Sequence, residues 1–149
     1  MANTASGIYC TTFMDVFDTT QLAIDLDLET HKGALFTNSI TPNFSSDTAY
    51  GVSPYDANEA TGTNWPSGGV ALTGTNLSIS SGTVIFDATD VSVASTTITN
   101  ARGYLLYADA LAGDRAILLV NFGADYSTVN GTFAITWAAG GVASWDLTP

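Results

Sequence analysis

Residues 77–86 read LSISSGTVIF, two runs of strand-forming residues that are separated by Ser81-Gly82. A two-residue turn that contains glycine, placed between two such runs, is typical of an antiparallel β-hairpin. The stretch therefore predicts two paired strands in the middle of the chain.

Further strands are expected on both sides of this hairpin. Asn130-Gly131 is the strongest short hairpin signal in the chain, and after it apolar residues at 133, 135 and 137 alternate with Thr132, Ala134 and Thr136. Short strands with turn residues between them predict an all-β fold, an antiparallel β-sandwich of the jelly-roll or immunoglobulin-like type. The other expected strands lie within residues 22–28, 32–38, 97–99, 102–108, 116–121 and 143–147.

The first part of the chain is less regular than the second. Residues 1–12 are small and polar, and they predict an N-terminal arm or a loosely attached first strand. Residues 13–149 are expected to form a single β-sandwich domain, with one short helix within residues 13–21. Residues 39–69 contain three of the four prolines and predict a long loop, which is often a functional feature in a domain of this size.

The charge of the chain limits its partners. The 149 residues include 14 acidic and only 3 basic ones, which gives a formal net charge of −11. Binding to nucleic acid or to anionic lipid needs a basic surface, so we expect neither partner. No apolar run approaches the roughly 18 residues of a membrane helix, and no basic residue precedes Lys32 as a secretory signal would need, so we expect synthesis in a cytoplasm.

No catalytic set, cofactor site or metal site is expected. His31 is the only histidine; it is expected on the surface at a strand end, and no nucleophile motif accompanies it. Cys10 is expected to be a small, partly buried apolar side chain, although a disulfide between chains stays open. Carboxylates at positions 25, 27 and 29 and around residues 87–90 and 109–114 match no calcium-loop motif, and solvated turn residues are the simpler interpretation. We therefore expect that the protein is not an enzyme.

Aromatic side chains in the long loop are the candidate contact residues. Tyr50, Tyr55 and Trp65 lie among glycine, serine and asparagine, a composition that contact surfaces use. They are expected to form a partner interface. The alternative is that they plug one end of the sandwich.

Five strings and the opening MANTA carry a resemblance to a known family. The strings are HKGALFT (31–37), NEATGTNWPSGGVAL (58–72), FDATDV (86–91), TITNARGYLLYAD (97–109) and FGADYSTVNGTFAITWAAGG (122–141). With them the chain resembles a family of small virion proteins that are encoded among the structural genes of tailed bacteriophages. The resemblance covers nearly the whole chain and departs from the family pattern over residues 39–50.

This resemblance implies a virion structural protein. The first expectation is a head decoration or minor capsid protein that binds the lattice of the major capsid protein on the capsid exterior, after synthesis in the cytoplasm of the host bacterium. Such a subunit would be a homo-oligomer, with a trimer favoured, because symmetry multiplies a modest contact. The alternative is a tail or head-fibre subunit that binds a host-surface glycan through the aromatic loop at residues 50–69. A small hydrolase is the least favoured hypothesis.

Overall fold

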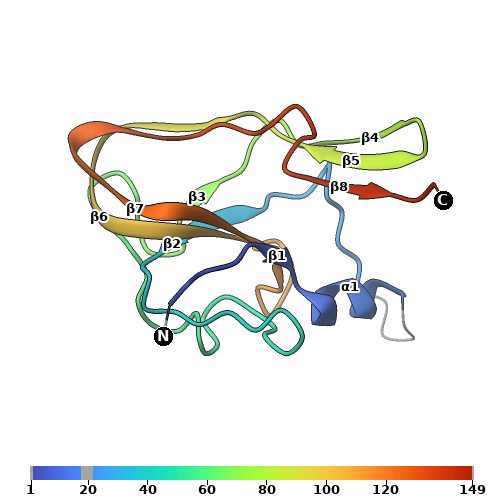
Figure 1. Ribbon diagram of the computed structural model, residues 1–149, viewed down its shortest axis with the longest axis horizontal. Coiled ribbons are helices and arrows are strands. Elements are labelled where there is room, and N and C mark those ends of the chain that lie inside the picture. Colours follow the sequence, from blue (N-terminus) through green and yellow to red (C-terminus); the bar gives the residue numbers. More distant parts are fainter. Residues whose placement is uncertain (1, 18–21, 149) are drawn as a thin grey trace.

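The computed structural model describes residues 2–17 and 22–148, which form two antiparallel sheets and one short helix (Figure 1). The five-stranded sheet has the order β1-β7-β6-β2-β3, and the three-stranded sheet has the order β4-β5-β8. The prediction of a sandwich-like, antiparallel all-β fold is confirmed. The elements are β1 (Gly7–Ile8), α1 (Cys10–Phe17), β2 (Lys32–Phe36), β3 (Val70–Ala71), β4 (Asn76–Ser80), β5 (Thr83–Asp87), β6 (Val91–Tyr107), β7 (Ala116–Ile135) and β8 (Ala143–Asp146).

The predicted hairpin at residues 77–86 is the pair β4–β5. Both turn residues have positive φ, 48° at Ser81 and 80° at Gly82, which is the backbone that a tight hairpin turn requires. The last strand, β8, pairs with the other side of β5 and completes the small sheet.

Two long strands, β6 and β7, dominate the large sheet. They pair along most of their 17 and 20 residues, but the register shifts several times, and both strands curve back above the sheet (Figure 1). The prediction of a hairpin at Asn130-Gly131 is wrong, because this pair lies inside β7. Asn130 has a φ of 46°, and two residues of β7, Val129 and Asn130, stand opposite the single residue Thr97 of β6 between the pairs Thr96–Gly131 and Ile98–Thr128. The left-handed residue therefore makes a β-bulge that bends the strand instead of ending it.

The predicted strand at residues 22–28 is also wrong. The backbone turns there, and Asp25 Oδ1 accepts hydrogen bonds from the backbone N–H groups of Asp27 and Leu28. Glu29 Oε2 accepts a further bond from the N–H of Asp25. Short acidic side chains bond readily to nearby backbone donors, so the alternation of polar and apolar residues here belongs to a turn.

Most of the N-terminal segment is part of the folded body. β1 pairs with Leu118 and Leu119 of β7, and Tyr9 is fully buried. The expected boundary between an arm and the domain, after residue 12, falls inside α1. The sequence left open whether residues 1–12 form an arm or a loosely attached first strand, and the structure has an attached strand, β1. The expected helix at residues 13–21 begins earlier, at Cys10, and residues 18–21 lie outside the described residues.

The large sheet is buried on both faces. Leu35, Tyr104 and Leu106 belong to the core between the sheets, whereas their neighbours Phe36 and Leu105 face a second core. The loop between β2 and β3 covers this second core, which confirms the predicted long loop (Figure 1). Strands with two buried faces explain the continuous apolar runs at residues 104–108 and 116–120.

Candidate functional site

Two of the three aromatic residues that were expected to contact a partner are core residues. Trp65 is 0% exposed and packs edge-on against Phe133, with 5.4 Å between the ring centroids. Tyr55 is 2% exposed, and its hydroxyl group bonds to that of Tyr9. The structure corrects the expectation for these two residues, because a partner cannot reach them. The alternative was that these residues plug one end of the sandwich; in the structure Trp65 belongs to the core between the sheets and Tyr55 to the second core under the long loop.

Tyr50, the third of these residues, is half-buried. Its ring stacks on Tyr107 at a centroid distance of 4.6 Å, and its hydroxyl donates to Glu59 Oε2 at 3.0 Å. Glu59 also accepts the backbone N–H of Gly68 and the hydroxyl of Ser67, so its carboxylate ties the loop together. Of the three expected contact residues, Tyr50 alone keeps part of its side chain exposed to a partner.

Four buried tyrosines make the stability of the fold sensitive to alkaline pH. Removal from water raises the pKa of Tyr9, Tyr55, Tyr104 and Tyr107 well above the usual phenol value of about 10. Because the folded state holds the neutral phenols, their contribution to stability is complete below that value and is lost as the pH rises above it. We expect the tyrosinate absorbance of these four residues, the larger part of the total from six tyrosines, to rise only together with the loss of the circular dichroism of the fold. Full tyrosine ionisation in a protein that keeps its native spectrum would contradict this expectation.

The residues with acid–base or nucleophilic potential do not converge. His31 is fully buried, not on the surface as expected; its ring lies edge-on to Phe86, and Nε2 is 2.9 Å from the carbonyl oxygen of Asp25. Cys10 is exposed and not partly buried, because it is the first residue of α1 and points away from the core. Within residues 2–17 and 22–148, no three side chains of His, Cys, Asp or Glu are grouped as a metal site would need.

An exposed apolar groove lies between α1 and the small sheet, and we call it the α1 face. The helix presents Met14 and Phe17, which are 67% and 75% exposed, and Phe13 stacks on Trp145 of β8 with 6.5 Å between the ring centroids. The groove holds about 290 Å³. Its walls are almost entirely hydrocarbon, and they include Ile8, Val16, Leu26, Leu77, Trp145 and Leu147. Contiguous exposed apolar surface of this kind is typical of an interaction site.

The protein offers negative charge but no free basic side chain to a partner. The formal net charge is −11, and Asp25 and Asp27 adjoin the lining residue Leu26 in the sequence. All three basic side chains of the protein are already used in ion pairs: Lys32 with Asp109 at 3.1 Å, Arg102 with Asp125 at 2.7 Å and Arg115 with Asp15 at 3.1 Å. Among the described residues, a second copy of this chain would therefore bring net negative charge and no unpaired Lys or Arg side chain.

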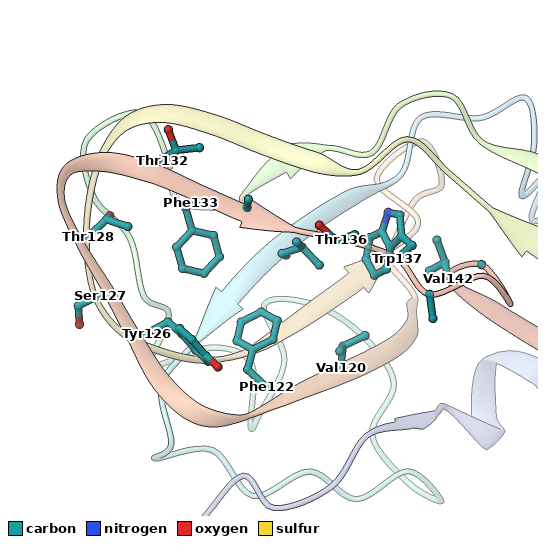
Figure 2. Close-up of a pocket in the computed structure, with 14 residues that line it drawn as sticks. Val120, Phe122, Tyr126, Ser127, Thr128, Thr132, Phe133, Thr136, Trp137 and Val142 are labelled. Atoms are coloured by element: carbon teal, nitrogen blue, oxygen red, sulfur yellow. The ribbon is translucent and has the colours of Figure 1, made fainter.

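A second concave site, the β7 cleft, lies inside the bend of the long hairpin (Figure 2). Figure 2 shows Phe122 and Phe133 approaching one another from the two halves of β7, with Tyr126 beside them at the bend. The centroids of the Phe122 and Phe133 rings are 6.1 Å apart, and Tyr126 lies edge-on to Phe122 at 6.0 Å. The cleft has a volume of about 670 Å³, and the described residues that line it carry no charge.

Hydrogen bonds with β6 and with the segment between β5 and β6 hold the two ends of the β7 cleft. At one end Arg102 of β6 donates to Asp125 Oδ1 at 2.7 Å and to the carbonyl oxygen of Gly123 at 2.6 Å, which fixes the bend that follows Phe122. At the other end Trp137 donates its backbone N–H to Asp90 and its indole N–H to the carbonyl oxygen of Thr89. Three of the strings that carry the family resemblance, FDATDV, TITNARGYLLYAD and FGADYSTVNGTFAITWAAGG, are thus joined around this cleft.

Comparison of the chain with protein-family models, with curated proteins and with solved structures finds no match. The one helix in the described part of the chain has eight residues, and no described helix has the length and apolar character to cross a membrane. The geometry of the two surfaces is therefore the basis for a function.

Proposed function

We propose that this protein is a structural subunit of a bacteriophage particle, a decoration or minor capsid protein that binds the major capsid protein on the capsid exterior. The observation that carries the proposal is the α1 face, a groove whose walls are almost entirely hydrocarbon and beside which Met14 and Phe17 are highly exposed. The family resemblance of the sequence supplies the virion context.

The size and chemistry of the α1 face suit protein–protein attachment. Large apolar side chains at the centre of an interface contribute most of its binding energy, and a polar rim excludes water around them. Phe17 and Met14 project from the helix as such central residues, and Phe13 with Trp145 forms a firm base. A subunit that repeats by symmetry, as in the favoured trimer, would multiply this contact on the lattice.

The net charge of the protein defines the charge of the complementary surface. Because the chain carries a formal net charge of −11 and its three basic side chains are paired, electrostatic attraction has to come from cations of the partner. The same net charge disfavours the docking of two α1 faces on one another, since two negatively charged copies repel. We therefore propose a capsid surface that combines an apolar ridge with flanking lysine or arginine residues.

Attachment to capsids can be tested directly. We expect purified subunits to add to shells that lack them, and Phe17→Ser to weaken this addition at least tenfold, because the loss of one buried phenyl group costs about 1.5–3 kcal/mol. Val129→Ser is the matched control, since Val129 is also a highly exposed apolar residue but lies on β7. Occupancy should fall as salt rises. Equal occupancy for wild type and Phe17→Ser would remove the α1 face from the proposal, and no addition at any salt concentration would remove the capsid partner.

A tail or head-fibre subunit that binds a host-surface glycan is the second candidate function. The loop at residues 50–69 does not favour it, because Tyr55 and Trp65 are buried. The observation that favours it is the β7 cleft, whose aromatic walls are open to solvent.

A further inference from the structure

We propose that the β7 cleft is a binding site for a neutral saccharide. This inference gives the second candidate function a site, and it depends on no residue of the α1 face. Three properties of the cleft carry it: a preformed aromatic wall, an uncharged lining and a volume suited to a small ligand.

The aromatic wall is partly exposed and firmly held. Tyr126 is 52% exposed, and Phe122 and Trp137 are half-buried, so their rings present open surface to the cleft. Trp137 is fixed by its two hydrogen bonds, and the backbone beside Phe122 is fixed by Arg102. The C–H groups of a sugar ring carry partial positive charge and pack on the negative face of an aromatic ring, which makes such a wall a suitable platform. Preorganisation lowers the entropy that binding would otherwise cost.

The polarity of the lining argues for a neutral polar ligand. Within the described residues, no acidic or basic side chain lines the cleft. Anions are disfavoured by the net charge of −11, and cations find no carboxylate among the described lining residues. A saccharide packs its C–H groups on the rings and brings no charge into the lining. The volume of about 670 Å³ lies in the range of sites for small ligands and accommodates a short oligosaccharide.

The experiment uses the three tryptophans as separate reporters. Trp65 is in the core, Trp145 is in the α1 face and Trp137 is in the β7 cleft, so their indole N–H signals in a nuclear magnetic resonance spectrum report on three places. The full chain is titrated with chitotriose, cellotriose and mannotriose, and toluene serves as an apolar probe. We expect at least one trisaccharide to shift the Trp137 signal in a saturable way, while the Trp65 and Trp145 signals stay in place.

Variants then assign the contact. Tyr126→Ala should weaken the binding about tenfold, because it removes one stacking face from an exposed position, whereas Tyr126→Phe should keep it. Phe17→Ser should bind the sugar as the wild type does, which separates this site from capsid attachment. Saturation of the Trp137 signal by toluene alone, or equal binding by Tyr126→Ala, would overturn the proposal. A shift that depends only on protein concentration would also overturn it, because the cleft would then be a contact between copies.

Discussion

Replacing Trp65 by alanine is expected to lower the free energy of unfolding by about 3–5 kcal/mol, the usual cost of removing a large buried aromatic side chain. Trp65 is fully buried at the centre of the core between the sheets and packs against Phe133. A loss of this size is a large part of the roughly 5–15 kcal/mol that stabilises an ordinary domain. Urea denaturation followed by circular dichroism measures this loss of free energy. If the slope of the free energy against urea concentration stays the same as in the wild type, the substitution has changed stability alone.

Trp65→Phe is the informative control. The indole N–H of Trp65 is buried and has no hydrogen-bond partner among the described residues, a situation that costs free energy in a folded protein. Phenylalanine keeps most of the apolar contact and removes this unpaired donor, so its effect should be much smaller than that of alanine. An alanine variant as stable as the phenylalanine variant would mean that Trp65 is not packed as the structure has it, and it would restore the residue as a candidate for partner contact.

The sequence was sufficient for the fold class because its strongest signals were local. The turn Ser81-Gly82 and the strand runs beside it predict β4–β5 without any long-range information. Residues 133–137 likewise alternate as predicted, with Phe133 and Ile135 buried and their neighbours exposed. In each case the pattern of side chains and the backbone preference favour the same structure.

The errors arose where a local signal had two structural outcomes. Asn130-Gly131 supplies a left-handed residue, which serves a hairpin turn or a β-bulge equally well, and only pairing with β6 decides between them. The alternation at residues 22–28 fits a strand, but Asp25 bonds to the backbone two and three residues later. Neither outcome can be read from the residues alone, because the competing partners are distant strands in one case and backbone donors in the other.

Neither surface of the candidate site was predicted. Phe13, Met14 and Phe17 are apolar residues near the N-terminus, and the sequence does not show that the fold leaves them uncovered. The β7 cleft depends on the bend at Gly123 and Asn130, which brings the two halves of one strand together. The sequence does carry a signal for the β7 cleft. Gly123 and Asn130 favour positive φ and lie between two apolar runs, and in the 20-residue strand β7 they are the points at which the strand bends. The aromatic loop was a plausible candidate by composition, but its rings close the core.

Two glycines with the same backbone should respond very differently to alanine. Gly69 has a φ of 75° and Gly51 a φ of 77°, so both occupy the left-handed region that costs other residues about 1–2 kcal/mol. An added Cβ at Gly51 meets nothing within 4 Å, whereas at Gly69 it would lie 1.8 Å from the carbonyl oxygen of Gly33. That oxygen belongs to the backbone of β2, opposite which β3 begins, so the clash can be relieved only by separating the two strands.

Gly51→Ala is therefore expected to lower the free energy of unfolding by about 1 kcal/mol, because the reduced freedom of the unfolded chain offsets part of the strain. Gly69→Ala should cost roughly 3 kcal/mol or more, since overpacking adds to the same strain. Asparagine separates the two causes, because it tolerates positive φ but still carries a Cβ. Gly51→Asn should be close to wild type in urea denaturation, and Gly69→Asn should be as unstable as Gly69→Ala. If asparagine rescued position 69, the left-handed backbone and not the contact between β2 and β3 would be what requires glycine there.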